Sequence, residues 1–276
     1  MPKLRVSALI CGQPGAVELW TLRRMHATPC ELTVIQSEHA TAIPAWKRFR
    51  RMRRELGLPA VASRFLAKPL AARMAKQNEQ LLDQLLDVEE LRQWWSESGL
   101  ALVKVPTLNH EDCRLALRAA APDVVVRVSG GILKPHIFSL ARLAALNIHH
   151  GRAPLIRGMW SIPWGLVEGR RDWIGATVHV IDAGIDTGTI LWRGGTQLAP
   201  GDTQADLFFR SHLEAVDALA AILTEYASGT DVRPWPIAPG EVSTYRSAPG
   251  LGTWLKFLYW GAGRRAPISL ERIIEC

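Results

Sequence analysis

Three observations predict an α/β protein with an open, mostly parallel sheet and helices on both faces. Residues 4–11, 16–27 and 32–35 have, in order, the patterns of an apolar strand, an amphipathic helix and a second strand. Such a unit pairs its strands in parallel and lays the helix on the sheet. Strand-like and helical runs go on alternating as far as residue 228. The chain is 48% hydrophobic and 21% charged, which is typical of a globular protein with a buried core.

The first strand–helix–strand unit begins close to the N-terminus. Its turn, Gly12-Gln13-Pro14-Gly15, precedes a helix in which Leu19, Leu22 and Met25 recur at helical spacing. The turn does not match the G-x-G-x-x-G pattern, so it predicts no dinucleotide site.

Residues 45–98 interrupt this alternation. They are basic at first, in the run 47–54, then acidic, and leucines recur at a spacing of three to four residues between 81 and 91. The pattern predicts a helical insertion of two or three helices, with Pro59 and Pro69 breaking the run. A basic run of this kind is typical of a solvated helix face.

The second half of the chain returns to alternating elements. We expect, in order, a short strand at 103–106, a helix at 111–121 with Leu115 and Leu117 inward, a strand at 123–128, a helical patch at 138–146, a helix at 161–168, and strands at 175–181 and 190–193. Thr203 with Asp206 three residues later forms a capping box, which predicts a helix from there to about residue 227, ended by Gly229.

The elements up to residue 228 therefore predict one domain, and residues 229–276 a short C-terminal extension. This extension is rich in Pro, Gly and Arg. Its apolar segment 254–260 has the pattern of a small helix, either docked on the core or serving as a surface anchor.

Three polar side chains at strand ends form a candidate site. Asn147 and His149 stand two residues apart, so an extended backbone projects them to the same face. Asp186 lies in the Gly-rich loop that follows the strand 175–181. An amide, an imidazole and a carboxylate at neighbouring strand ends are the parts of a proton-transfer site, although an Asn-x-His can also simply cap a turn.

Three nearby residues have less specific patterns. His150 is expected to face solvent or to stand behind His149. For His179, two roles are equally compatible with the pattern: a buried core histidine with its hydrogen bonds satisfied, or a residue that supports the site residues from behind. Asp182 is expected to shape its own loop by accepting backbone N–H bonds.

The net charge and the cysteine content indicate which classes of binding partner and which cellular compartment to expect. The net charge is +7 and the pI about 9.6, which suits anionic partners. No apolar run approaches a membrane span, and the N-terminus lacks the pattern of a signal peptide, so we expect a cytoplasmic protein without a membrane span. Four scattered cysteines have neither disulfide nor zinc spacing, and we expect no metal: Cys11, Cys30, Cys113 and Cys276.

The order and spacing of several motifs resemble the folate-dependent formyltransferases, which include the glycinamide ribonucleotide, methionyl-tRNA and amino-sugar N-formyltransferases. The resemblance covers about residues 121–206. It rests on Pro122-Asp123-Val124-Val125-Val126, Gly131-Ile132-Leu133, Asn147-x-His149 with Pro154 and Arg157-Gly158, Gly175-Ala176-Thr177-Val178-His179, and Asp182-x-Gly184-x-Asp186-Thr187-Gly188. The interval of 37 residues from His149 to Asp186 is close to that of the family.

The resemblance implies a Rossmann-like domain that binds 10-formyltetrahydrofolate and transfers its formyl group to a primary amine. It maps the family's catalytic residues onto Asn147, His149 and Asp186. The segments that it implies for binding the pterin ring contain Gly131, Leu133, Val180, Ile181, Asp182, Ala183 and Gly184.

The segment expected to bind the acceptor amine departs from the family pattern. Many members have Ser-Leu-Leu-Pro after the histidine, whereas this chain has Gly151-Arg152-Ala153-Pro154. We expect Gly151, Arg152 and Arg157 to bind the acceptor, with the two arginines clamping a phosphate if the acceptor carries one. The favoured acceptor is a small amine, an amino sugar or a nucleotide-linked amino sugar, and a homodimer is compatible with the pattern.

Other functions stay open. The basic pI would suit a methionyl-tRNA formyltransferase, but about 49 residues remain after the helix that ends near 227, which is too few for the C-terminal barrel of that enzyme. Transfer RNA is therefore the less favoured partner. A hydrolase that releases formate from 10-formyltetrahydrofolate, or a non-catalytic binding protein of the same fold, is compatible with the same motifs.

Overall fold

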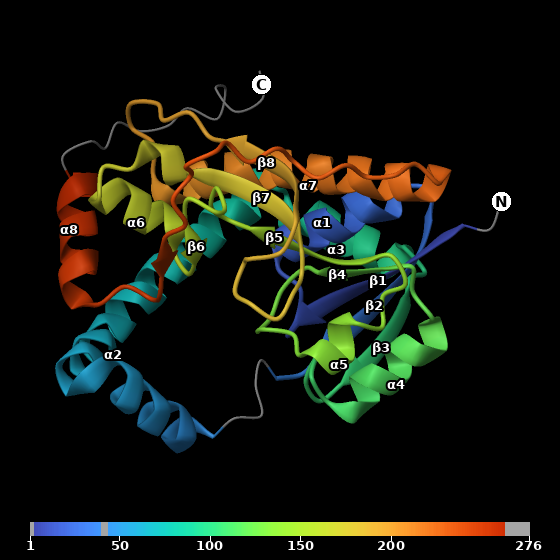
Figure 1. The fold of residues 1–276 in the computed structure, drawn as a ribbon, viewed down its shortest axis with the longest axis horizontal. Helices are drawn as coiled ribbons and strands as arrows, with labels where there is room; N and C mark the ends of the chain where they lie inside the picture. The colour runs from blue at the N-terminus through green and yellow to red at the C-terminus, as the bar shows by residue number, and fades with distance from the viewer. Residues whose placement is uncertain (1–2, 40–43, 263–276) are drawn as a thin grey trace.

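The computed structural model describes residues 3–39 and 44–262, and a seven-stranded sheet lies at its centre (Figure 1). The strand order is β3-β2-β1-β4-β5-β7-β8. The first five strands in this order run parallel, whereas β7 and β8 are antiparallel to their neighbours. The bounds are β1 Leu4–Cys11, β2 Cys30–Ser37, β3 Ala101–Val105, β4 Val124–Arg127, β5 Ala144–His149, β7 Gly175–Val180 and β8 Ile190–Gly195. The predicted α/β fold with a mostly parallel sheet is confirmed.

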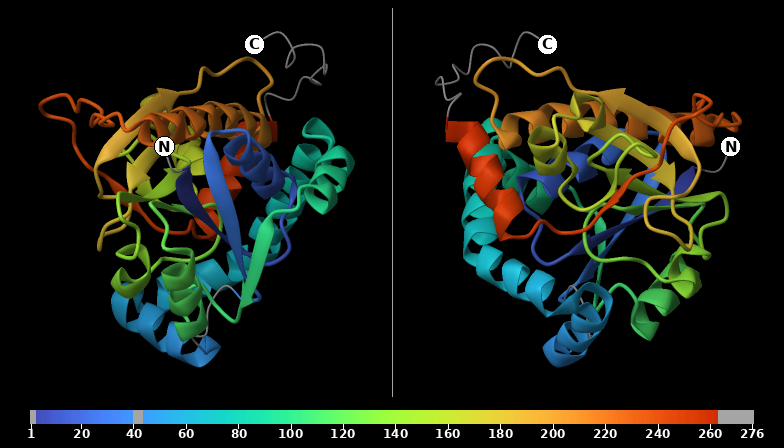
Figure 2. Two further views of the ribbon diagram at one scale, coloured as in Figure 1. Left: turned by 90° about the vertical axis from the view of Figure 1, so that its right-hand side faces the viewer. Right: turned by 60° about the vertical axis from the view of Figure 1, so that its left-hand side comes forward.

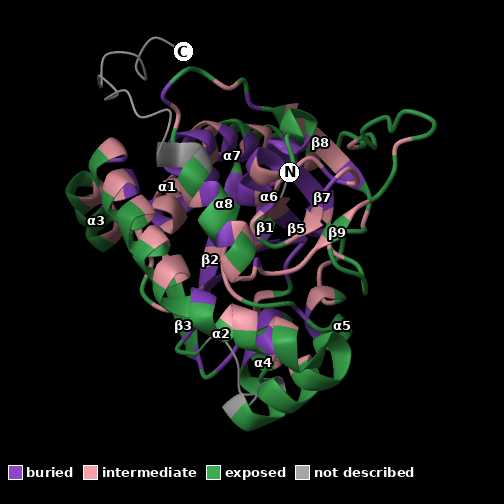
Figure 3. Ribbon diagram, turned by 90° about the vertical axis from the view of Figure 1, so that its left-hand side faces the viewer, coloured by how far each residue is buried: buried purple, intermediate pink, exposed green. Residues whose placement is uncertain are grey.

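Helices cover both faces of this sheet. One face carries α1 (Ala16–His26), α3 (Val88–Glu97) and α7 (Gln204–Ser228), and the other carries α4 (Glu111–Ala120) and α5 (Pro135–Phe138). Side chains alternate along β1, so Ile10 packs with Leu22 and Leu219 on the first face while Leu9 packs with Leu117 on the second. Two buried cores thus hold the strands in register (Figure 3).

Residues 45–98 form α3 and a long kinked helix, α2 (Ala45–Leu85), which extends away from the sheet (Figures 1 and 2). The two parts of α2 and α3 agree with the predicted two or three helices. The kink of α2 lies at Gly57, whose φ of 79° is left-handed and suits glycine. The predicted break at Pro69 is wrong, because the helix continues through it. Leu82 and Leu86 near its end pack with residues of α1 and α7. The second half of α2 is thereby anchored on the domain.

Two further expectations are wrong. The patch at 138–146 is not helical, because β5 begins at Ala144 as a central strand between β4 and β7. The requirement to bury Leu146 inside the sheet overrides the helix preference of its Ala- and Leu-rich sequence. Leu115 points outward with 52% exposure, and Cys113 occupies the inward position beside Leu117.

The long helix α7 has the predicted ends. Thr203 and Asp206 form the capping box, and Gly229 closes the helix with a left-handed φ of 76°. No described helix has the length and apolar character needed to cross a membrane.

The described part of residues 229–276 packs on the domain. A short strand, β9 (Tyr245–Arg246), pairs with β6 (Arg157–Gly158). The helix α8 (Leu251–Ala262) then packs against α2 and against α6 (Ser161–Val167). Trp254 is 1% exposed and meets Trp160 edge to face, so this helix is docked on the core, as one of the two alternatives expected. The division at residue 228 stays a prediction, and Cys276 lies outside the described residues.

Candidate active site

A cavity of about 860 Å³ opens at the carboxyl ends of β4 and β5. Ligands bind at this edge of open parallel sheets, where loops and helix N-termini converge. On one side the cavity is lined by the loops 130–133 and 181–186. The other side is formed by the start of α1, the second half of α2, α6 and the first turns of α7.

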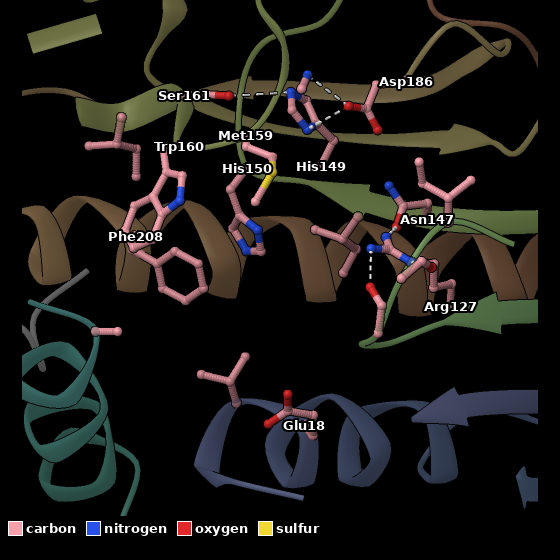
Figure 4. Close-up of a pocket in the computed structure, with 18 of the residues that line it drawn as sticks. Glu18, Arg127, Asn147, His149, His150, Met159, Trp160, Ser161, Asp186 and Phe208 are labelled. Carbon is pink, nitrogen blue, oxygen red and sulfur yellow. Dashed lines mark hydrogen bonds and ion pairs between the residues drawn. The ribbon is translucent and has the colours of Figure 1, made fainter. Parts of the chain in front are cut away.

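The structure brings Asn147, His149 and Asp186 together in this cavity (Figure 4). Asn147 and His149 project from β5 and are 5% and 6% exposed. Asp186 lies in the loop after β7, with a left-handed φ of 50°. Its Oδ2 is 3.4 Å from Nδ1 of His149 and accepts the N–H of Gly158 at 2.9 Å. The loop conformation thus aims the carboxylate back at the strand that carries the other two residues.

The amide of Asn147 has a fixed orientation. Arg127, which is its register partner on β4, donates to Oδ1, and a guanidinium can only donate. Nδ2 therefore faces away from Arg127 and lies 3.0 Å from Nε2 of His179. His179 Nδ1 lies 2.8 Å from the carbonyl oxygen of Val180, so this nitrogen carries a proton. Its Nε2 faces both Nδ2 of Asn147 and, at 3.5 Å, Oδ1 of Asp186, and in the neutral ring it accepts from Asn147. One of the two N–H groups of Asn147 is left for a ligand.

His149 is set up to accept a proton. Its Nε2 is 3.0 Å from the carbonyl oxygen of Ile156, and its Nδ1 is 3.4 Å from Oδ2 of Asp186, so both ring nitrogens face acceptors. When Nε2 donates to Ile156, the neutral ring has its lone pair on Nδ1. Burial lowers the pKa of His149, and the nearby Asp186 carboxylate offsets part of that shift. A proton arriving at Nδ1 would form an ion pair with Asp186 across 3.4 Å.

Asp186 stays ionised beside these rings. Burial alone would raise the pKa of Asp186, but the imidazoles of His179 and His149 and the N–H of Gly158 outweigh it and hold the pKa below its ordinary range. The carboxylate is therefore available to stabilise a positive charge on His149.

Most of the segments expected to bind the pterin line the loop side of the cavity. Gly131, Leu133, Ile181, Asp182 and Gly184 are among the lining residues, whereas the neighbouring positions Val180 and Ala183 are not. Asp182 is turned into its own loop, where it accepts the N–H of Gly184 and the hydroxyl of Thr187. Its expected role in shaping the loop agrees with these contacts.

The residues expected to bind the acceptor lie outside the lining. Arg152 donates to the carbonyl of Asp172, and Arg157 donates to Ser243 and to the carbonyl of Ile185. Gly151 lies behind His149, where an added Cβ would stand 2.7 Å from Nε2 of that ring. The phosphate clamp stays a prediction, and these contacts do not support it.

Several residues at the cavity were not predicted. Arg127 could have been found from its place at the end of the strand next to Asn147. Glu18, Gln204 and the α2 face of Ala75, Asn78, Glu79, Leu82 and Asp83 carry no local sequence signal, because tertiary packing alone brings them to the site. No cluster of three or more His, Cys, Asp or Glu suited to a metal is found within residues 3–39 and 44–262.

His150 is half-buried and follows His149 directly in the chain. It lines the cavity and stacks on Phe208 with ring centroids 4.1 Å apart. Its Nε2 is 3.1 Å from Nδ1 of His212, and Nε2 of His212 is 3.1 Å from the hydroxyl of Thr21. A buried chain of hydrogen bonds therefore leads from the cavity to α1.

Comparisons with known proteins agree with this geometry. A family model described as formyl transferase matches residues 69–223. A methionyl-tRNA formyltransferase of Anaeromyxobacter dehalogenans is 34% identical over 140 residues, which are 50% of this chain and 45% of that protein. One from Chlorobium chlorochromatii is 30% identical over 153 residues, which are 55% and 47% of the two chains. The chain thus spans less than half the length of these relatives.

Solved structures share the fold at low identity. A 4-N formyltransferase from Francisella tularensis superposes with a TM-score of 0.52 at 12% identity, over 87% of this chain and 76% of that chain. Glycinamide ribonucleotide transformylase 1 from Symbiobacterium toebii gives a TM-score of 0.53 at 16% identity, over 82% and 89%. A sugar N-formyltransferase from Shewanella gives 0.51 at 13% identity, over 93% and 87%.

Proposed function

Because the chain belongs to the formyl transferase family, we propose that it transfers a formyl group from 10-formyltetrahydrofolate to the primary amine of a small substrate. The single observation that carries the proposal is the convergence of Asn147, His149 and Asp186 at one cavity. The acceptor class favoured by the sequence is an amino sugar, free or nucleotide-linked.

The transfer requires three events. The lone pair of the amine nitrogen forms a bond to the formyl carbon, and the bond from that carbon to N10 breaks. One proton leaves the amine nitrogen, and one is taken up by N10, so the products are an N-formyl amine and tetrahydrofolate. Negative charge builds on the formyl oxygen between bond formation and bond breaking, and the proton must be carried between the two nitrogens.

Asn147 is suited to stabilise that negative charge. Its free N–H is held in place by Arg127 on the oxygen side and His179 on the nitrogen side of the amide. A preorganised donor of this kind stabilises a developing oxyanion by about 3 kcal/mol.

His149 and Asp186 are suited to move the proton. The neutral ring has its lone pair on Nδ1, and the imidazolium formed there is stabilised by Asp186 at 3.4 Å. The same nitrogen then returns the proton to N10, which completes the balance.

The loop side of the cavity fits the co-substrate. Leu133 is 3% exposed and, with Ile181, offers apolar contact, while the backbones of 131–133 and 181–184 offer hydrogen-bonding groups. A flat ring with polar edges suits such a lining, and the cavity volume is that of a small-molecule site. The co-substrate supplies the activated formyl group.

An assay of tetrahydrofolate release tests the proposal. The protein is incubated with 10-formyltetrahydrofolate, with and without a panel of primary amines that includes amino sugars, and products are identified by mass. Amine-dependent release together with an N-formyl product is the expected result. Release that needs no amine would identify a hydrolase, and absence of folate binding would reject folate-dependent transfer altogether.

Methionyl-tRNA is a second candidate acceptor. It is supported by the name of the sequence relatives and by the net charge of +7, which suits nucleic acid. An arm of the same assay with methionyl-tRNA decides between the two, because a tRNA-directed enzyme would formylate it in strong preference to free amines.

A further inference from the structure

The side of the cavity opposite the loops 130–133 and 181–186 is acidic. We call this side, formed by α1, α2, α6 and α7, the acceptor wall. It presents the carboxylates of Glu18, Glu79 and Asp83 and no Lys or Arg among the described lining residues. The cavity's one lining arginine in the described chain, Arg127, belongs to the other side and is engaged by Asn147 and by the carbonyls of Gly130 and Gly131.

These carboxylates are not neutralised by neighbours. None of the three has a salt-bridge partner within the described ranges, and Glu18 only accepts the N–H of Gly15. Some surface carboxylates elsewhere are paired with arginines, for example Glu90 with Arg23, whereas others, such as Glu31 and Asp231, have no ion pair in the described chain. What distinguishes the wall is that three carboxylates face one cavity side without a lining cation, in a chain whose net charge is +7.

Gln204 adds a buried acceptor to the wall. It is 7% exposed, it lines the cavity one turn before Phe208, and its Oε1 has no hydrogen-bond partner in the part of the chain that the structure describes. An unpaired buried carbonyl is costly, so such an atom is normally satisfied by a donor. Because Gln204 lines the cavity, a bound ligand or a water molecule there can supply that donor, and a cationic ligand group would do so with charge.

His150 presents a second acceptor. The hydroxyl of Thr21 donates to the carbonyl of Val17 at 2.8 Å, so it accepts from Nε2 of His212. Nδ1 of His212 must then accept from Nε2 of His150, which leaves Nδ1 of His150 as a lone-pair acceptor. The ring stacks on Phe208, and the face of Phe208 and of the nearby Trp160 adds an aromatic surface that suits a cation.

We propose that the acceptor substrate carries a second cationic group and no phosphate: a small diamine, a diamino sugar or a basic amino acid. One amine reacts at Asn147 and His149, while the other binds as an ammonium at the acceptor wall, with Glu18, Asp83 and Gln204 as its partners. The inference rests on the proposed transfer reaction and narrows its substrate. A phosphate or diphosphate placed there would meet carboxylates and lone pairs without a cation to oppose it.

Three matched amines test this inference: 1,4-diaminobutane, 4-aminobutanol and 4-aminobutyl phosphate. They share one skeleton and differ in the distal group alone. We expect kcat/KM to be at least about tenfold higher for the diamine than for the alcohol, because the alcohol cannot form the charge-assisted hydrogen bond to the half-buried Glu18 and Asp83. It should be lowest for the phosphate, because the carboxylates repel its negative charge. Equal rates, or preference for the phosphate, would overturn the inference.

Two substitutions locate the effect. Asp83→Asn should raise KM for the diamine about tenfold and leave the KM for the alcohol unchanged, whereas Asp231→Asn, an exposed site outside the cavity, should change neither. Gln204→Leu removes the unpaired acceptor, so it should raise the Tm of the free protein while abolishing the Tm shift that the diamine gives. A diamine KM that does not respond to Asp83→Asn would contradict the assignment.

Binding separates this inference from the proposed reaction. Calorimetric titration of the protein with 1,4-diaminobutane needs no turnover. Binding that Asp83→Asn weakens, without any N-formyl product, would retain the acceptor wall and reject the transfer reaction. Formylation of other amines without any binding of the diamine would retain the transfer reaction and reject the acceptor wall as a cation site.

Discussion

Nδ2 of Asn147 lies 3.0 Å from Nε2 of His179, and this contact, with Arg127 on the other side of the amide, determines which way the amide faces.

The substitution Asn147→Ala removes this fixed hydrogen-bond donor. We expect kcat to fall about 100- to 1000-fold, which is the loss seen when one oxyanion donor is removed. Steady-state kinetics measure it, with Gln93→Ala, an exposed amide on α3, as the control. A fall below tenfold would remove Asn147 from the stabilisation of the oxyanion.

His179 should act through Asn147 as a positioning residue. His179→Leu leaves Nδ2 without its acceptor, so kcat should fall about tenfold while the folate Kd stays unchanged. His179→Gln retains an acceptor oxygen and should restore part of the rate. If the two variants were equally impaired, the loss would reflect packing and not the hydrogen bond.

His149→Ala should abolish turnover while folate binding survives within about tenfold. Nδ1 of His149 lies 3.4 Å from Asp186, which would stabilise a proton taken up there, whereas Nε2 of His179, 3.5 Å from Asp186, is engaged by Asn147. Fluorescence titration with the folate and the release assay measure the two properties separately. Retained turnover would exclude His149 from the mechanism.

Acid should destabilise the protein through His212. Burial lowers the pKa of His212 to about 4, below the ordinary value of 6.5, so the unfolded state binds its proton first as the pH falls. The free energy of unfolding should therefore drop between pH 6.5 and 4, by roughly 3 kcal/mol from this residue. Above pH 6.5 the ionisation of His212 should no longer affect the free energy of unfolding.

Urea unfolding at a series of pH values measures this dependence, and His212→Leu should flatten it. His150 contributes in the same direction, because burial and the neighbouring His212 hold the pKa of His150 well below its ordinary value. An unchanged slope in His212→Leu would assign the acid sensitivity to other groups.

Arg157→Ala tests the phosphate clamp expected from the sequence. Its guanidinium donates to Ser243 and to the carbonyl of Ile185, next to Asp186. We expect kcat to fall severalfold through loosening of that loop, with the acceptor KM unchanged. A raised KM confined to a phosphorylated acceptor would instead restore the clamp.

The periodic parts of the fold were predictable from the sequence. The ends of α7 are set by the capping box at Thr203 and by Gly229, which are local signals. The sequence predicts a helical patch at 138–146 because alanine and leucine favour helices, but the place of residues 144–146 between two strands decides their conformation. Local preference is weak compared with the free energy of burying a central strand.

The site was predictable where it depends on neighbouring positions in one strand. Asn147 and His149 are two residues apart, and the loop with Asp186 follows the strand paired with theirs. The roles of Glu18, Asp83 and Gln204 depend on three helices that meet only in the folded chain. The spacing of residues along the sequence does not predict that these three helices come together.

The acceptor wall owes Glu79 and Asp83 to a helix that contributes nothing to the seven-stranded sheet. The reacting groups sit instead on β5 and on the loop after β7. Substitutions on the cavity face of α2 should therefore change the proposed acceptor preference without displacing Asn147, His149 or Asp186, provided that the packing of Leu82 on α1 and α7 is kept.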